Sequence, residues 1–574
     1  MLKKLFFSAL LLVGVLSADA QYVVNKWRVN FTDKNNSPYS IGSPSAYLSP
    51  KAIARRSAQG IPIVQNDIPV NSWYVDSVRN TGVTILNVSK WFNSVTILTI
   101  DTSKIAQILA FPFVQSVDSL ADTPVKKGAK RIYKNRDTMK EGDQVGFELT
   151  SDVFPELLMM PSCVSVQTYD YGQGYTQIHM LATDYLHDLG YRGQGMTIAI
   201  LDAGFYNVNS LPIFDSLFAN NQVLGTKDFV NPGGSVYAVG THGMSVLSTM
   251  GGNLPGELIG TAPKANYYLL RTEDGATEFP IEEDNWVCGA EYADSVGADV
   301  INSSLGYTNF DNTNWSHTYA DMDGEHCRSS RGAAIAASKG ILVVNSAGNS
   351  GNDPWNYIGA PADADSILTV GAVDEYGIYA YFSSNGPSYD LRVKPNVCAM
   401  GLGTFVANST GGVQAGNGTS FSSPVMAGSA TCLWQANPGM NNLQIINVLQ
   451  QSADHYLNPD TLYGYGIPNL AAAHLILGGK QIHNFDLESN INVSPNPFTD
   501  HFSIVFYSTK NTILSIELFD AGGKSVFKQD SVVRDIGYNY IPVRNLEHIP
   551  AGVYILKVVS GEAVFTNKMM KTEH

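Results

Sequence analysis

A serine placed between a glycine turn and an apolar segment is the first candidate for chemistry in this sequence. Ser420 follows Gly418, and the small and apolar residues at 425–434 predict a buried helix. Pro424 suits the first turn of such a helix, where its missing N–H costs little. A serine at a helix start lies beside unpaired backbone amides, which stabilise a developing negative charge. Ser420 is therefore a candidate nucleophile, with a plain helix N-cap as the alternative.

Three more side chains stand where catalytic groups could act. Asp202 ends the apolar run 196–201, His242 lies between glycines, and Asn349 directly follows Gly348. Histidine is the side chain whose ordinary pKa suits proton transfer near neutral pH, and an asparagine amide can donate to an oxyanion. Each residue also has a structural alternative, as a turn aspartate, a core histidine or a turn asparagine.

The surrounding elements predict how these side chains are positioned. Apolar runs at 196–201, 299–306 and 339–349 alternate with helical segments, which is typical of a largely parallel sheet. Catalytic groups gather at the carboxyl ends of such strands. We therefore expect an α/β fold with a mostly parallel sheet flanked by helices.

Asp202, His242 and Ser420 occur along the chain in the order Asp–His–Ser, the order found in subtilisin. Seven blocks resemble the signature blocks of the subtilisin-like serine peptidases, across about residues 165 to 478. They are 200–204, 240–243, 260–265, 302–306, 345–349, 394–396 and 418–424.

This resemblance implies a serine endopeptidase that hydrolyses proteins or peptides through an acyl-enzyme intermediate. It implies that Asp202 orients His242, that His242 activates Ser420, and that Asn349 helps to form the oxyanion hole. No cofactor is required for that chemistry. The implied substrate-binding residues are Ser303, Ser304, Leu305, Gly306, Ala347 and Gly348.

Two features depart from the family pattern. Ala203 stands where the family more often has serine or threonine, a change that we expect to be tolerated. An insertion at 307–331 carries Asp321, Asp323 and Glu325, which could hold a structural calcium ion. Their spacing fits no EF-hand loop, so a solvated loop that shapes the substrate site is the preferred interpretation.

The N-terminal part predicts secretion and a zymogen. Residues 1–20 have a basic start, an apolar run and small residues before a cleavage point, as in a signal peptide. Residues 21–120 predict a small α+β pro-domain that resembles the inhibitor-type propeptides of this family, so the chain's own propeptide is an expected inhibitor. Residues 121–165 form a linker or processing region with a basic cluster: Lys126, Lys127, Lys130, Arg131, Lys134 and Arg136.

The C-terminal part predicts a separate β domain. The peptidase domain is expected at 166–478 and a linker at 479–490, and short alternating strands at 491–574 predict a β-sandwich. The stretches 493–498, 549–554 and 568–571 resemble the C-terminal sorting domain of type IX secretion. That resemblance implies contact with outer-membrane secretion machinery and export to the cell surface or beyond. A carbohydrate- or protein-binding sandwich is the alternative.

Composition narrows the remaining function classes. The chain has 574 residues and a formal net charge of −15, which argues against nucleic acid as a partner. Its five cysteines contain no C-x-x-C motif, and Cys288 with Cys327 is one disulfide option. We expect a monomer. A non-enzymatic adhesin on a dead peptidase fold should have lost one of the four catalytic candidates, and an acid-acting sedolisin would carry a glutamate in place of His242.

Overall fold

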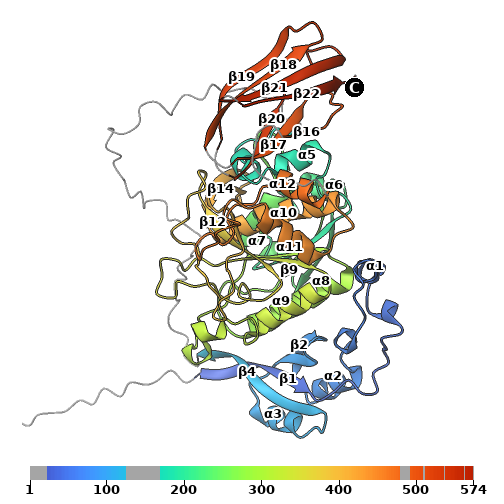
Figure 1. Ribbon diagram of the computed structural model, residues 1–574. Helices are drawn as coiled ribbons and strands as arrows, with labels where there is room; N and C mark the ends of the chain where they lie inside the picture. The colour runs from blue at the N-terminus through green and yellow to red at the C-terminus, as the bar shows by residue number, and fades with distance from the viewer. Residues whose placement is uncertain are drawn as a thin grey trace, which may run out of the picture.

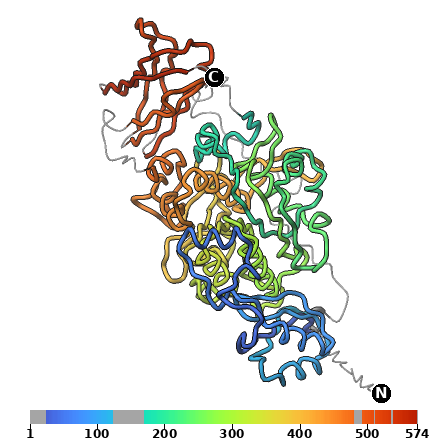
Figure 2. The backbone as a smooth tube through the Cα atoms, turned by 90° about the vertical axis from the view of Figure 1, so that its right-hand side faces the viewer, coloured from blue at the N-terminus to red at the C-terminus, as the bar shows by residue number. Residues whose placement is uncertain are grey.

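The chain forms three units, which the computed structural model describes for residues 22–124, 169–478, 491–508, 511–534, 537–561 and 563–572. The expected signal peptide, the basic cluster and the linker at 479–490 lie outside these residues. The N-terminal unit packs at one end of the central unit and the C-terminal unit at the other (Figure 1). A second view shows the same order along the molecule (Figure 2).

The N-terminal unit is an antiparallel sheet with the strand order β2-β3-β1-β4. Its core joins Val29 and Phe31 of the sheet to Val78 and Ile108 of the helices, all buried. β4 continues beyond residue 120 because β1 pairs with it as far as Pro124. The elements are β1 (Tyr22–Phe31), η1 (Pro44–Ala46), α1 (Pro50–Ala58), η2 (Gln65–Asp67), α2 (Ser72–Arg79), β2 (Thr84–Ser89), β3 (Ser94–Leu98), α3 (Thr102–Leu109) and β4 (Val114–Pro124).

The central unit contains the expected parallel sheet, with seven strands in the order β13-β12-β11-β10-β5-β9-β6. All of its pairings are parallel. The strands are β5 (Thr197–Asp202), β6 (Val223–Asp228), β9 (Asn266–Arg271), β10 (Val300–Ser303), β11 (Leu342–Ser346), β12 (Leu368–Val373) and β13 (Val397–Met400). Two small hairpins are β7 (Asn253–Leu254) with β8 (Leu258–Ile259), and β14 (Leu402–Ala407) with β15 (Val413–Asn417).

Helices cover both faces of this sheet, because neighbouring side chains of one strand point to opposite sides. In β5, Ile198 and Ile200 join the cluster that contains α7, α10, α11 and α12. Ala199 and Leu201 join the cluster that contains α8 and α9. The helices are α4 (Tyr175–His179), α5 (Thr183–Asp188), α6 (Asp215–Ala219), α7 (His242–Gly251), α8 (Ile281–Val296), α9 (Arg328–Ser338), α10 (Thr419–Ala436), α11 (Asn442–Gln451) and α12 (Leu470–Leu477).

Helix α10 is buried from Thr419 to Trp434, as the sequence predicts. The helix begins at Thr419, so Ser420 lies at its start as expected, but the buried stretch begins earlier than the predicted residue 425. Pro424 therefore lies within the helix and not at its first position. A proline is tolerated there because only one backbone hydrogen bond, the one to the Ser420 carbonyl, is lost.

The C-terminal unit is the expected β-sandwich of two antiparallel sheets, β16-β17-β20 and β19-β18-β21-β22. Phe502, Ile516 and Leu556 are among the residues that fill the space between them. The strands are β16 (Asn492–Ser494), β17 (Phe502–Ser508), β18 (Thr512–Asp520), β19 (Ser525–Arg534), β20 (Gly537–Val543), β21 (Gly552–Ser560) and β22 (Ala563–Lys571).

Two further observations concern the described residues. The suggested pairing of Cys288 with Cys327 is wrong, because both cysteines are free thiols and both are buried. The Cys288 sulfur faces the Val88 carbonyl at 3.8 Å, while the Cys327 sulfur faces the Asp321 carbonyl at 3.5 Å. No helix in the described ranges is long and apolar enough to cross a membrane.

Candidate active site

The end of β5 and the start of α7 place a carboxylate against an imidazole. Asp202 is fully buried, and its Oδ1 lies 2.8 Å from His242 Nδ1. The same oxygen accepts a hydrogen bond from the Ala203 amide at 2.7 Å. A Cβ on Gly243 would lie 2.4 Å from the Gly204 carbonyl oxygen, so only glycine lets α7 begin this close to the strand. These contacts hold the imidazole of His242 against Asp202 through Nδ1.

Ser420 lies in the first turn of α10. Gly418 precedes the helix with a φ of +151°, a backbone conformation that side-chain-bearing residues rarely adopt. The Ser420 carbonyl would bond to the amide of residue 424, but Pro424 has no N–H. The Ser304 hydroxyl donates to that carbonyl instead, at 2.9 Å. The chain after β10 is therefore tied directly to the candidate nucleophile.

Asn349 is oriented by the residue that precedes Ser420. Its Oδ1 accepts hydrogen bonds from the Thr419 amide at 2.8 Å and the Thr419 hydroxyl at 2.9 Å. The Thr419 hydroxyl in turn accepts from the Gly348 amide at 3.2 Å. Because its Oδ1 faces Thr419, the N–H₂ group of the Asn349 side chain points away from Thr419. Sequence reasoning missed Thr419, although its place directly before Ser420 was a usable signal.

The four candidate segments converge on one site. The ring of His242 lies 6.2 Å from that of Phe421, the residue after Ser420. Of the substrate-strand candidates, Ser303 accepts a hydrogen bond from Trp286 at 2.9 Å, and the Leu305 carbonyl accepts one from Asn345 at 3.2 Å. Gly306 is exposed beside them, while Ala347 and Gly348 follow the end of β11.

The insertion after the substrate strand borders the N-terminal unit. Asn312 donates to Asp122 at 2.9 Å, and Trp315 packs with Phe279 against Leu120 of β4. The insertion's carboxylates serve local turns, since Asp321 accepts from Thr318 and Asp323 accepts from Glu325. The insertion therefore flanks the path along which β4 approaches the central unit.

The single carboxylate cluster of metal-binding geometry among the described residues lies elsewhere. Oxygens of Glu273, Glu278 and Glu282 lie within 4.8 Å of one another. Burial raises the pKa of Glu273 and of Glu282 well above the ordinary range. Oxygen ligands of this kind suit a hard cation, so these are the side chains that could hold one. The insertion's Asp321, Asp323 and Glu325 do not belong to this cluster.

Comparison with known proteins assigns all three units. Residues 193–466 match the subtilase family, residues 26–136 match a Bacteroidota peptidase S8 propeptide domain, and residues 492–572 match a secretion system C-terminal sorting domain. Subtilisin E of Bacillus subtilis is 30% identical over 331 residues, which cover 55% of this chain and 77% of that protein. Subtilisin DY of Bacillus licheniformis is 31% identical over 316 residues, which cover 54% and 99%. The solved structure of MycP1 from Mycobacterium smegmatis aligns with a TM-score of 0.41 at 22% identity, covering 52% of this chain and 84% of that one.

The chain belongs to the subtilase family. It is a serine endopeptidase made as a zymogen, with an N-terminal propeptide and a C-terminal type IX sorting domain. The sorting domain directs export through the outer membrane to the cell surface or the extracellular space.

Proposed function

We propose that Ser420, His242 and Asp202 together carry out peptide-bond hydrolysis, with Ser420 as the nucleophile, His242 as the base and Asp202 behind His242. Ser420 Oγ attacks the scissile carbonyl carbon while His242 Nε2 takes the hydroxyl proton. The tetrahedral intermediate then collapses, the C–N bond breaks, and His242 returns the proton to the leaving amine. A water molecule then attacks the acyl-enzyme in the same way, with His242 as the base, and the Ser420 hydroxyl is restored. Asp202 keeps the imidazole in the correct tautomer and stabilises its charged form.

Asn349 and the Ser420 amide form the oxyanion hole in this proposal. The negative charge develops beside the first turn of α10, where the helix dipole and unpaired amides favour it. Residues Ser303, Ser304, Leu305 and Gly306 pair with the substrate backbone as an added strand, and together with Ala347 and Gly348 they line the S1 pocket. The hydroxyls of Ser303 and Ser304 already have partners inside the protein, Trp286 and the Ser420 carbonyl.

The observation that carries the proposal is the 2.8 Å contact between Asp202 and His242 beside the helix that begins at Thr419. The fixed orientation of Asn349 supports the same assignment. An aspartate and a histidine at a strand end and a helix start are common separately. Their direct contact next to a serine with an oriented amide fits acyl transfer.

The test is Ser420→Ala in the full chain, with hydrolysis of a denatured protein as the readout. We expect activity to fall to background while the far-UV spectrum stays unchanged. Ser422→Ala is the matched control, because Ser422 is buried two residues further along α10 and its hydroxyl donates to the Thr419 carbonyl at 3.1 Å. Asn349→Ala should lower kcat about 10²–10³-fold, a figure that comes from subtilisin. Undiminished hydrolysis by Ser420→Ala would refute the assignment.

We also propose the division of the chain that its composition suggests: signal peptide 1–20, pro-domain 21–120, processing region 121–165, peptidase 166–478, linker 479–490 and sorting domain 491–574. Proteins or peptides are the proposed substrates, and a monomer is the proposed state. Mass spectrometry of the secreted protein would place both processing sites, and light scattering would give the state.

A further inference from the structure

The propeptide contains a segment that does not belong to its own core. We call residues 44–67, which include η1, α1 and η2, the clamp. The buried core of the propeptide runs from Val29 and Phe31 directly to Val70 and Tyr74, with no clamp residue among the described members of that cluster. Ala52 and Arg56 of α1 are nevertheless 0% and 1% exposed. Both residues contact the peptidase domain, since Arg56 pairs with Asp294 at 2.8 Å and the Ala52 backbone lies against Gly297.

The clamp covers the C-terminal ends of α8 and α9. The guanidinium of Arg55 donates to the Ala298 carbonyl and, at 3.2 Å, to the Lys339 carbonyl. Gln59 donates to the Gly340 carbonyl at 3.0 Å. These carbonyls belong to residues just beyond the last residues of α8 and α9, where the negative end of each helix dipole favours a cation. One arginine therefore serves both helix ends.

A buried cluster of charges joins the clamp to the same helix ends. Asp294 of α8 lies 2.6 Å from Arg55 and 2.8 Å from Arg56, and Arg56 also lies 2.9 Å from Asp67. Lys339 reaches Asp67 at 3.0 Å. These five side chains are at most 4% exposed. A buried ion pair is costly when one partner is missing, so the cluster accepts only a segment with the matching charges.

The shapes of the two surfaces also match closely. A Cβ on Gly297, the C-cap of α8, would lie 2.7 Å from the Ala52 amide nitrogen. Its φ of +85° already favours glycine there. The close approach of the clamp backbone adds a second reason for glycine, one that exists only while the clamp is bound.

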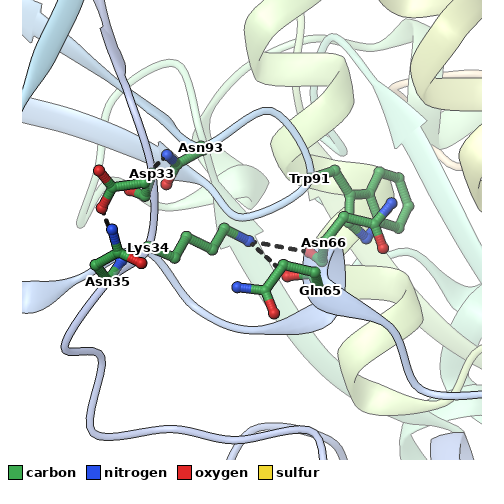
Figure 3. A pocket seen from close by; sticks show the side chains of 7 residues that line it. All are labelled: Asp33, Lys34, Asn35, Gln65, Asn66, Trp91 and Asn93. Atoms are coloured by element: carbon green, nitrogen blue, oxygen red, sulfur yellow. Dashed lines mark hydrogen bonds between the residues drawn. The ribbon is translucent and has the colours of Figure 1, made fainter.

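Lys34 connects the clamp to the rest of the propeptide. Its ammonium donates to the carbonyls of Gln65 at 3.2 Å and Asn66 at 3.4 Å, and to the Lys90 carbonyl at 2.6 Å. Figure 3 shows this side chain reaching toward Gln65 and Asn66 beside a cavity of about 360 Å³. Lys90 lies in the β2–β3 turn, which makes its own contacts with α8. The clamp and the turn are thus two contact regions joined by one lysine.

We propose that the clamp is a second recognition element that sets how long the propeptide stays bound after the chain is cut. It rests on the proposed function, since it regulates that same catalytic site. Two joined contact regions dissociate together far more slowly than either would alone. The clamp acts at the helix ends and leaves the Asp202–His242–Ser420 site to the other parts of the propeptide. Its partner is the peptidase domain of its own chain, selected by the paired arginines.

The test compares Arg56→Met with Arg79→Met in the full chain. Arg79 pairs with Asp76 on α2, and both side chains are more than half exposed. Each purified protein is cut once with trypsin or by itself, and two quantities are followed: the propeptide that co-elutes with the peptidase domain, and the lag before peptide hydrolysis appears. We expect Arg56→Met to lose the co-eluting propeptide and to shorten the lag at least tenfold, while Arg79→Met behaves as the parent.

Equal lag and equal co-elution for the two variants would overturn the clamp. If Arg56→Met does not fold, Gln59→Ala, which removes a single hydrogen bond at the edge of the clamp, should still shorten the lag severalfold, and an unchanged lag would again overturn it. An inactive parent would instead contradict the catalytic proposal, and co-elution after the trypsin cut would still decide the clamp.

Discussion

The propeptide and the sorting domain both pack against the peptidase domain, but they use different chemistry. The propeptide contact is rich in buried charge, with Asp294 between Arg55 and Arg56, and Glu291 accepting hydrogen bonds from Ser89 at 2.6 Å and from the Lys90 amide at 2.7 Å. Trp91 is its main apolar anchor.

The sorting-domain contact is mostly apolar and aromatic. Val505 and Tyr540 join the large core cluster of the peptidase domain, and the ring of Tyr540 lies 5.5 Å from that of Tyr185. One buried cation completes it, since Arg544 lies 3.2 Å from Asp184 and 2.6 Å from Asp188 of α5.

The chemistry of each contact determines how easily it separates. Water solvates carboxylates and guanidinium groups once they separate. A polar contact can therefore be selective while the two parts are bound, without exposing apolar surface after they dissociate. Apolar contacts resemble a divided core and leave exposed hydrophobic surface when they separate. The propeptide face therefore suits an inhibitor that must leave, and the sorting-domain face suits a domain that is exported with its cargo.

Removing the apolar anchor of the propeptide should have the largest effect. Trp91 is 6% exposed and joins the buried cluster that contains residues of α8 and α9. Trp91→Ala should weaken propeptide binding by about 3–5 kcal/mol, a hundredfold or more, because a large buried side chain is lost. The dissociation constant of the cut propeptide, measured by diluting the processed protein, tests this prediction. Trp73→Ala is the control, since Trp73 is 62% exposed in the same propeptide, and equal dissociation by both variants would contradict the role of Trp91.

Removing the cation of the sorting-domain contact should have a smaller effect. Arg544→Met leaves Asp184 and Asp188 without this cation, which should cost about 3 kcal/mol. Hydrogen exchange of the α5 amides in the full chain should speed up, and adding Asp188→Asn should restore much of the protection. Lys528→Met is the control, because its pair with Asp530 is half exposed. Unchanged exchange in Arg544→Met would mean that the apolar contacts alone hold the domain.

Acid should destabilise α5, beside the sorting-domain contact, more than it destabilises the propeptide contact. Burial lowers the pKa of His187 on α5 to about 4, from an ordinary 6.5. Between these values the unfolded chain binds a proton that the folded chain does not, so stability is present above pH 6.5 and is lost as the pH falls toward 4, by up to about 3 kcal/mol. Exchange of the α5 amides at pH 7 and pH 4.5 measures this loss, which His187→Gln should reduce.

The propeptide side should resist the same change. Burial alone would raise the pKa of Asp294, but the charges of Lys90, Arg56 and Arg55 outweigh it and leave this pKa below its ordinary value. The carboxylate therefore keeps its charge as the pH falls. The control for His187→Gln is His326→Gln, because the His326 side chain is 64% exposed. Earlier acid release of the clamp than of α5 would contradict this ordering.

Local sequence made much of the fold predictable. The fully buried strand β5 appears as an unbroken apolar run, and buried α10 as a run of small and apolar residues. Ser420 lies at the start of α10 as predicted, but Pro424 was wrongly expected in the first turn, because the chain tolerates it five residues into the helix. The Ser304 hydrogen bond to the Ser420 carbonyl could not be predicted, since it depends on where that helix begins.

The sequence alone determined which side chains are available for chemistry and which segments are buried, because residue type, glycine placement and apolar periodicity are local properties. Only the tertiary structure decided which charges meet. Arg56 and Asp294 are separated by 238 positions, and nothing in either neighbourhood indicates the other. A buried charge is tolerated only where a distant partner neutralises it, so its role becomes visible only after the chain has folded.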